Sequence, residues 1–298
     1  MKNILILGSS GFIGRSLVEH FCNNYGNRIK KLTLIQRKKF HQNINHKTKI
    51  QISCIRNNLY NMKSLPNCDA LIYCIKSNNS DEALKLFDHF KNLISKKKKC
   101  KILFLSSGAI YGPNNKKIKL NENIKISLDK IELYKDYKLN YAKQKFILES
   151  KFSELSKNGY KISIARCFAF YGEHILDRSF YISKFIKLIK QKKKNYKINN
   201  LSHIFRSYMY SYDMCEWLYT ILNKTGNKLE IYNVGSDETI NLNVLSLRIA
   251  KKFKKKIKFK INPKDKITDY YIPSVEKIKK MLKVKTRFDL KKIIEGII

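Results

Sequence analysis

Short apolar runs alternate with longer amphipathic segments along much of the chain. The apolar runs predict the strands of a sheet. They lie at Ile4–Leu7, 30–36, 49–55, Asp69–Cys74, 101–107 and from Lys161 onward. Between them, apolar positions recur at helical spacing, which predicts helices over Phe12–Asn24, Ser80–Ser95 and Lys135–Lys157. Strands that alternate with such helices form a parallel sheet with helices on both faces, so the expected fold class is α/β.

A turn punctuated by glycines follows the first strand. Gly8 ends the strand, Gly11 lies in the turn and Gly14 lies in the first turn of the helix. Such glycines allow a tight turn, a close backbone approach to a pyrophosphate and close helix–sheet packing, and the helix N-terminus adds N–H donors. The pattern predicts a Rossmann-type, doubly wound dinucleotide-binding unit. The expected cofactor contacts here are Gly8, Ser10, Gly11, Phe12, Ile13 and Gly14.

The end of the second strand leaves the type of nicotinamide cofactor open. NAD-binding units of this kind carry an acidic residue about twenty positions past the glycines, where it binds the adenosine ribose. No Asp or Glu lies between residues 32 and 68, and Gln36, Arg37 and Lys38–Lys39 occupy the place. The Arg37 guanidinium favours NADP over NAD because it suits a 2′-phosphate, whereas Gln36 suits a ribose hydroxyl. Asn58, after the third strand, is a further expected cofactor contact.

Candidate catalytic side chains lie at the end of the fifth strand and in the helix that follows. Ser106, Ser107 and Tyr111 stand at the carboxyl edge, where parallel sheets bind their ligands. Tyr141 and Lys145 are spaced i and i+4, so they share one helical face. A nearby ammonium favours a phenolate, and we expect it to lower the pKa of Tyr141 toward the working range of an acid or base.

The order and spacing of several motifs resemble the extended short-chain dehydrogenases/reductases, in particular the NAD-dependent epimerase/dehydratase family that acts on nucleotide sugars. These motifs are the glycine turn, SSGAIYG, YAKQK, ARCFAFYGEH, RSYMYSYD, YNVGS and IPSVEKIKKML. The resemblance spans nearly the whole chain. It implies that Tyr141 is the acid/base, that Lys145 holds the nicotinamide ribose and that Ser107 binds the reacting oxygen. It also implies a substrate contact at Tyr111, a homodimer through the Tyr141 helix and a role in polysaccharide biosynthesis.

Other positions depart from the family pattern. The 4,6-dehydratases of this group carry Asp-Glu after the catalytic hydroxyl, where this chain has Gly108 and Ala109. GDP-fucose synthases carry a cysteine base at the second of these positions and a histidine acid where His174 stands. Ala169 replaces the asparagine of the NxYG segment, and residues 73–76 replace the usual H-x-A-A. A 4,6-dehydratase is therefore not expected, and His174 is a candidate substrate contact.

The C-terminal part is expected to form a smaller α/β lobe that binds substrate. An amphipathic helix is predicted over Phe180–Lys192, and Asp213 is expected to cap a helix over Met214–Leu222. Arg206 resembles the family arginine that binds the nucleotide diphosphate, an anion that a bidentate guanidinium suits. With no linker between the lobes, the dinucleotide-binding domain is expected over 1–167 and again over about 201–235, with 168–298 mainly the substrate lobe.

Composition limits the partners. The 298 residues carry a formal net charge of +39, yet the lysines are spread along the chain, so the charge alone does not point to nucleic acid. No apolar stretch approaches the length of a membrane span. The seven scattered cysteines lack metal-ligand spacing, which favours reduced thiols, a cytoplasmic location and no bound metal.

The sequence therefore predicts an NAD(P)-dependent nucleotide-sugar oxidoreductase with a nucleotide-diphosphate sugar as substrate. The missing dehydratase acids and the missing acidic ribose ligand favour a 4-keto reductase that uses NADPH or NADH. The alternative is an NAD-dependent C4 epimerase, which uses the same Ser107, Tyr141 and Lys145. Remote alternatives are a nucleic-acid-binding protein and an NADP sensor without turnover, each keeping this fold.

Overall fold

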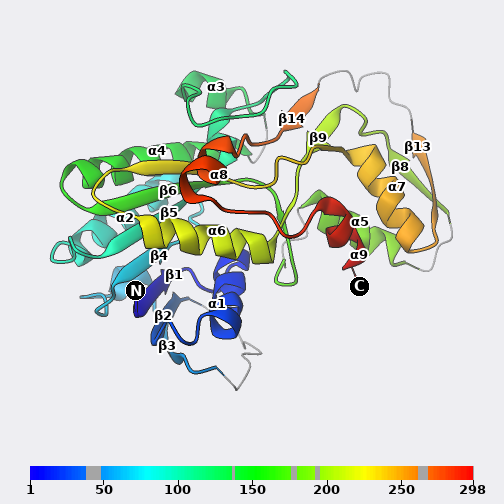
Figure 1. Ribbon diagram of the computed structural model, residues 1–298. Coiled ribbons are helices and arrows are strands. Elements are labelled where there is room, and N and C mark those ends of the chain that lie inside the picture. The colour runs from blue at the N-terminus through cyan, green and yellow to red at the C-terminus, as the bar shows by residue number, and fades with distance from the viewer. Residues whose placement is uncertain (38–47, 136–137, 176–179, 192–194, 261–267, 298) are drawn as a thin grey trace.

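A parallel sheet of seven strands forms the centre of the larger lobe (Figure 1). The computed structural model describes residues 1–37, 48–135, 138–175, 180–191, 195–260 and 268–297. The strand order is β11-β6-β5-β4-β1-β2-β3. These strands are β1 (Asn3–Leu7), β2 (Lys31–Gln36), β3 (Gln51–Arg56), β4 (Ala70–Tyr73), β5 (Lys101–Ser107), β6 (Lys161–Cys167) and β11 (Glu230–Val234). The order reverses on either side of β1, which confirms the doubly wound Rossmann class.

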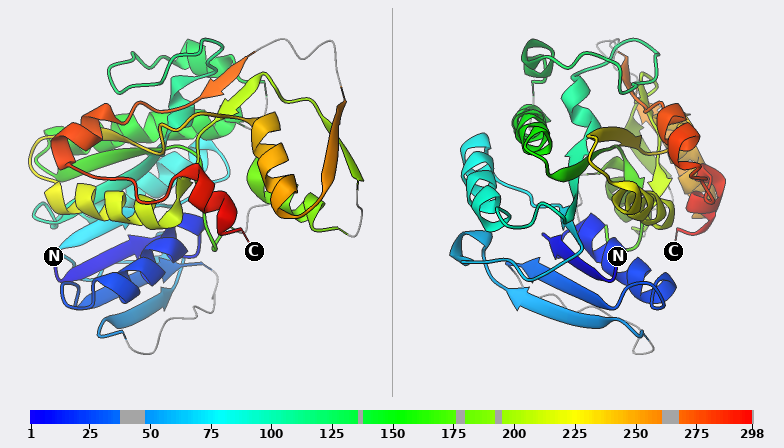
Figure 2. Two further views of the ribbon diagram at one scale, coloured as in Figure 1. Left: turned by 45° about the vertical axis from the view of Figure 1, so that its right-hand side comes forward. Right: turned by 60° about the vertical axis from the view of Figure 1, so that its left-hand side comes forward.

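Helices cover both faces of this sheet (Figure 2). On one face, α1 (Phe12–Asn24) packs against α6 (Ser211–Lys224). On the other, α2 (Ser80–Leu93) packs against α4 (Lys138–Lys157). The rings of Phe104 on β5 and Phe152 on α4 stack with centroids 4.3 Å apart. This contact fixes α4 on β5, with the first turns of α4 at the carboxyl edge of the sheet.

A smaller α/β lobe is built from elements that follow β6, seen at the right of Figure 1. Its helices are α5 (Tyr181–Ile189), α7 (Leu242–Lys252) and α9 (Leu290–Glu295), and its parallel strand pair is β8 (Asn195–Asn199) with β13 (Lys256–Lys260). Ile182, Phe185, Leu245, Ile249 and Leu290 lie in its apolar core.

Short elements join the two lobes. The strands are β7 (Phe170–Tyr171), β9 (Ile204–Arg206), β10 (Met209–Tyr210), β12 (Ile240–Asn241) and β14 (Asp269–Tyr271). They pair as β10-β7 and as β12-β9-β14. The remaining helices are α3 (Leu128–Glu132) and α8 (Glu276–Leu282). In Figure 1 the red segment runs from α8, beside the large sheet, to α9 in the smaller lobe.

Asp213 does not cap α6, and that expectation was wrong. The helix begins at Ser211, so Asp213 lies within its first turn. The Asp213 carboxylate accepts backbone N–H bonds from Arg287 and Phe288 at 3.0–3.1 Å. These donors come from the segment after α8, which no local pattern around Asp213 could indicate.

Other element boundaries differ modestly from the predicted ones. The strand predicted from Lys161 onward ends at Cys167, and Phe170–Tyr171 belongs to a separate sheet. The predicted start of the Tyr141 helix overlaps residues 136–137, and the predicted helix end at Lys192 also lies outside the described residues. Among the described residues, no helix combines the length and apolar composition that a bilayer crossing requires.

Candidate cofactor and active site

In the glycine turn, the packing of the protein requires glycine at two positions and leaves open space at a third. Gly8 has a positive φ of 84°, and a Cβ there would lie 2.7 Å from the Cys74 carbonyl oxygen. A Cβ on Gly14 would lie 2.6 Å from the Cα of Ser9. At Gly11, by contrast, only the Gly8 oxygen comes within 4 Å of such a Cβ, at 3.6 Å, in the described part of the chain. The open space above Gly11 suits the close approach of a ligand.

The N-terminus of α1 faces this turn with its donors available. Gly11 is the N-cap residue and contributes no side-chain bond, and the first turn carries no acidic residue. The first N–H groups of a helix have no intrahelical partner, so those of Phe12 and Ile13 are suited to an anion. Ser10 lies in the turn, where its carbonyl accepts the Arg15 Nε–H at 2.8 Å. This cradle fits the pyrophosphate of a dinucleotide.

The end of β2 contacts the glycine turn through Gln36. Its side chain is buried, and its Oε1 accepts a hydrogen bond from the Ser9 hydroxyl at 3.1 Å. Arg37 follows as an exposed residue, and Lys38–Lys39 lie outside the described residues. Asn58 caps the short 3-10 turn Leu59–Asn61 by accepting the Tyr60 N–H at 3.4 Å.

Ser107, Tyr141 and a third residue, Tyr271, meet at the carboxyl edge of the sheet. Ser107 ends β5, and its Oγ accepts the Ala109 N–H at 3.2 Å. Tyr141, on α4, and Tyr271, on β14, both lie close enough to Ser107 for its hydroxyl to lower the pKa of each phenol, against the larger effect of burial. The structure therefore brings Ser107 and Tyr141 together as the sequence predicts.

Burial, and not Lys145, governs the protonation of Tyr141. The Lys145 Nζ donates to the Leu105 carbonyl at 2.8 Å and lies 5.8 Å from the centroid of the Tyr141 ring. Burial raises the pKa of Tyr141 to about 12, against a smaller lowering by the neighbouring Ser107 hydroxyl. Burial also lowers the pKa of Lys145 to about 8. The expectation that Lys145 lowers the pKa of Tyr141 was therefore wrong, because the desolvation of the phenol dominates.

A buried ionic network lies behind this centre. The Arg166 guanidinium on β6 forms a fork with Glu149 on α4, with Nη2–Oε2 at 2.8 Å, and both residues are buried. Arg166 Nη1 also donates to the Tyr111 hydroxyl at 3.0 Å, which in turn donates to Asn233 Oδ1 at 2.9 Å. Tyr111 is only 1% exposed. Tyr111, which was expected to contact the substrate, therefore lies within the buried ionic network.

Tyr271 is a site residue that the sequence reasoning missed. It pairs with Arg206 across β14 and β9, and the guanidinium carbon lies 5.8 Å from the Tyr271 ring centroid. Arg206 Nη2 donates to Asp269 Oδ2 at 2.5 Å. The tyrosine doublet just before the IPSVEKIKKML motif was its only sequence signature. The Tyr271 side chain therefore lies between Arg206 and Ser107.

His174 lies elsewhere, against α1. Its Nε2 is 2.6 Å from Glu19 Oε2, and both side chains are partly exposed. The structure records no contact of His174 with Ser107, Tyr141 or Tyr271 among the described residues. Its surroundings are those of a partly exposed hydrogen bond between the turn after β7 and α1.

The positions after Ser107 leave no room for the dehydratase acids. A Cβ on Gly108 would lie 2.6 Å from the Phe168 ring, and Ala109 is buried. The residues in the described segments form no group of three or more His, Cys, Asp or Glu side chains that could hold a metal.

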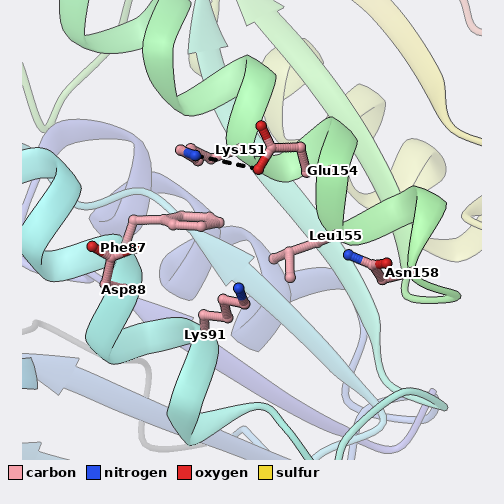
Figure 3. Close-up of a pocket in the computed structure, with 7 residues that line it drawn as sticks. All are labelled: Phe87, Asp88, Lys91, Lys151, Glu154, Leu155 and Asn158. Atoms are coloured by element: carbon pink, nitrogen blue, oxygen red, sulfur yellow. Dashed lines mark hydrogen bonds and ion pairs between the residues drawn. The ribbon is translucent and has the colours of Figure 1, made fainter.

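A small hollow between α2 and α4 is not a candidate site (Figure 3). Its volume is about 50 Å³, and its rim carries the Lys151–Glu154 ion pair at 3.3 Å. Ligand pockets for small molecules occupy about 300–1,000 Å³. The hollow also lies along the second half of α4, away from Tyr141.

Comparisons with known proteins agree with this geometry. Residues 4–235 match the family described as NAD dependent epimerase/dehydratase family. No curated protein sequence matches the chain.

Solved structures with the same fold include several enzymes bound to nucleotides. A dTDP-glucose 4,6-dehydratase from Bacillus anthracis, in complex with NAD, has a TM-score of 0.77 at 15% identity and covers 99% of this chain and 94% of its own. A UDP-glucose 4-epimerase from Bifidobacterium longum, in complex with NAD+ and UDP, has a TM-score of 0.77 at 14% identity and covers 98% of this chain and 96% of its own. A UDP-N-acetylglucosamine 4-epimerase from Methanobrevibacter ruminantium, in complex with UDP-N-acetylmuramic acid, has a TM-score of 0.73 at 20% identity and covers 99% of this chain and 97% of its own.

Proposed function

Since the chain belongs to the NAD-dependent epimerase/dehydratase family, we propose that it is a nucleotide-sugar oxidoreductase, and specifically a 4-keto reductase of an NDP-hexose. One observation carries the choice of reductase. Tyr141 lies beside Ser107, and burial raises its pKa to about 12. The phenol is therefore protonated at neutral pH, which suits an acid that donates a proton to an oxygen gaining negative charge.

Each residue of the site has a role in this proposal. Ser107 donates a hydrogen bond to the sugar carbonyl oxygen, and Tyr141 protonates that oxygen as the carbonyl is reduced. Lys145, whose Nζ donates to the Leu105 carbonyl, would hold the nicotinamide ribose. A nicotinamide cofactor, when bound, supplies the hydride. The open turn at Gly11 and the N-terminus of α1 would hold its pyrophosphate.

The substrate side of the site supports a nucleotide-diphosphate sugar. Arg206 is held beside Tyr271, where Nη2 donates to the Asp269 carboxylate and Nη1 to the Phe205 and Asp269 carbonyls. The Nε–H and the second Nη2 N–H remain as donors for a diphosphate. Tyr271 stacks near Phe168, with ring centroids 4.8 Å apart. These two rings form an apolar wall beside Ser107 that would exclude water from the reacting carbon.

For the cofactor we propose NADP in preference to NAD. The support is that Gln36, at the end of β2, carries no negative charge to repel a 2′-phosphate, and that Arg37 follows as an exposed cation. Replacing Arg37 with alanine should weaken NADPH binding more than NADH binding, as measured by the fluorescence of the reduced nicotinamide. Equal losses for both would count against the preference.

A C4 epimerase is the second candidate, because Ser107, Tyr141 and Lys145 also suffice for oxidation and re-reduction at one carbon. An epimerase first needs Tyr141 as a base, and the raised pKa of this phenol opposes that role. A reductase consumes reduced cofactor in proportion to product. An epimerase converts substrate with no cofactor added.

The test is incubation with a panel of nucleotide 4-keto sugars while NADPH and NADH absorbance is followed. Tyr141→Phe should lower turnover by a factor of about 10²–10⁴ and leave cofactor binding nearly unchanged. Tyr160→Phe is the matched control, because Tyr160 is buried away from the site and bonds the Ser95 carbonyl. Wild-type turnover in the Tyr141 variant would remove the assignment.

We also propose a homodimer through the face of α2 and α4. This face offers complementary charges, with Asp88 and Lys91 on α2 and Lys151 and Glu154 on α4 (Figure 3). Light scattering during size-exclusion chromatography should give twice the mass of one chain. A single-chain mass at micromolar concentration would contradict the dimer.

A further inference from the structure

Two cysteines meet at the amino-terminal edge of the sheet, at the opposite end of β5 from Ser107. Cys68 lies two residues before β4, and Cys100 directly precedes β5. Their Sγ atoms are 3.5 Å apart and share a hydrogen bond. Beside them the Lys101 N–H donates to the Asp69 carbonyl at 3.0 Å. The sheet itself therefore holds the two thiols together.

The two thiols differ in access and acidity. Cys68 is partly exposed, whereas Cys100 is 5% exposed. The hydrogen bond from Cys100 lowers the pKa of Cys68, and the Lys97 ammonium acts in the same direction. The same hydrogen bond, together with burial, raises the pKa of Cys100. Since the thiolate is the nucleophile, Cys68 is the attacking sulfur and Cys100 the resolving one.

The other five cysteines differ from Cys68 in acidity. Burial raises the pKa of each of them, namely Cys22, Cys54, Cys74, Cys167 and Cys215. Cys54 is exposed on β3, so its thiol is more accessible than that of Cys68 but less acidic, and it serves as an internal comparison.

We propose that Cys68 and Cys100 form a reversible thiol–disulfide site that reacts with small disulfides such as oxidised glutathione. The Cys68 thiolate attacks one glutathione sulfur, the glutathione S–S bond breaks, and one glutathione leaves and takes up a proton. Cys100 then loses its proton to solvent and attacks the Cys68 sulfur, which releases the second glutathione. The two protein thiols are oxidised, and one oxidised glutathione is reduced to two thiols.

The backbone geometry allows this closure. A disulfide bond is about 2.05 Å long, so the two sulfurs must approach by about 1.5 Å from their separation of 3.5 Å. The β4–β5 register, continued by one residue, places Cys100 opposite Asp69, so Cys68 is offset by one residue along its strand. A strand spacing of about 4.8 Å with a rise of about 3.3 Å per residue gives a Cα separation of about 5.8 Å, within the span of about 4.4–6.8 Å that a disulfide bridges. The change lies at the edge of the sheet opposite to Ser107 and is independent of the proposed hydride transfer.

The experiment treats the native protein with oxidised glutathione, quenches by acid and alkylation, and maps the peptides by mass spectrometry. We expect a peptide pair linked through Cys68 and Cys100, reversed by dithiothreitol, to form about tenfold faster than any modification of Cys54. Cys54→Ser is the matched control and should not change this rate. Faster reaction at Cys54, or a reaction that stops at glutathionylated Cys68, would overturn the proposal.

Two further variants separate the roles of the sulfurs. Cys100→Ser should accumulate a mixed disulfide between Cys68 and glutathione, because the resolving thiol is gone. Cys68→Ser should leave Cys100 unmodified, since Cys100 is buried. An unmodified Cys68 in the Cys100→Ser protein would also contradict the proposal. If either variant fails to fold by circular dichroism, the wild-type rates at Cys68 and Cys54 decide the question alone.

Discussion

Lys145 carries a charge that its buried position opposes. Its ordinary pKa of 10.5 is lowered to about 8 by desolvation, although Glu149 and nearby thiols act the other way. Between these two values the unfolded chain holds the Lys145 proton and the folded chain does not. The unfolded state therefore binds more protons, so the Lys145 contribution to stability rises with pH across this window.

This predicts that Lys145→Met is more stable than the wild type near neutral pH, by about 2 kcal/mol, while turnover is lost. The gain should shrink as pH rises through about 8 toward 10.5, because the wild-type lysine becomes neutral. Urea unfolding of both proteins at several pH values measures the difference. A gain that stays constant with pH would mean that methionine acts by packing alone.

Gly11 and Gly14 should respond differently to the same substitution. Gly14→Ala places a methyl group 2.6 Å from the Ser9 Cα, so we expect a loss of about 1–3 kcal/mol in the free energy of unfolding. Gly11→Ala meets only the Gly8 oxygen at 3.6 Å, so its stability should change by less than about 1 kcal/mol. Its binding of reduced nicotinamide cofactor, followed by fluorescence, should nevertheless fall. Unchanged cofactor binding in the Gly11 variant would place the pyrophosphate elsewhere.

At the scale of the element, α4 is anchored by an ion pair inside the protein. Glu149 follows Lys145 by one helical turn and is held by the Arg166 fork from β6. Glu149→Ala would leave Arg166 buried without its anion, and we expect the free energy of unfolding to fall by about 3–5 kcal/mol. Glu295→Ala, which breaks the exposed pair with Lys291 on α9, should cost less than about 1 kcal/mol. Urea unfolding compares the two, and equal losses would argue against a special role for the buried pair.

The elements that could be predicted from the sequence are those in which an apolar run or a helical spacing of apolar residues indicates a buried face. β1, α1 and β5 are such elements, and the parallel sheet then brought Ser107 and Tyr141 to one edge. The strands β8 and β13 were not predicted, although NYKIN and KIKFK alternate polar and apolar residues as half-exposed strands do; each alternation spans only five residues. Contacts between distant segments were equally invisible, as with Tyr271 against Ser107 and Asp213 against Arg287.

At the scale of the whole molecule, the excess positive charge repels itself. The formal net charge is +39, and desolvation together with the neighbouring charges of Lys161 and Lys224 lowers the pKa of Lys101. Raising sodium chloride from about 10 mM to about 150 mM shortens the screening length from about 30 Å to about 8 Å.

Screening should stabilise the fold, because it weakens repulsion in the compact state more than in the expanded one. We expect the thermal midpoint to rise by about 2 °C or more over this range of salt. Chloride is used because phosphate or sulfate would also bind the cradle at α1. Calorimetry that shows a falling midpoint would mean that attractive ion pairs outweigh the repulsion.

The path of the chain between the lobes has a consequence for synthesis on the ribosome. α6 carries Trp217, whose indole donates to the Lys285 carbonyl at 3.0 Å, and Asp213, which binds the backbone after it. The core on one face of the large sheet needs Val275 and Ile278, and the core of the smaller lobe needs Leu290 and Ile294, so a nascent chain that ends before residue 275 exposes apolar surface in both lobes. Prematurely terminated products should therefore be cleared by chaperones and proteases instead of persisting as stable half-enzymes.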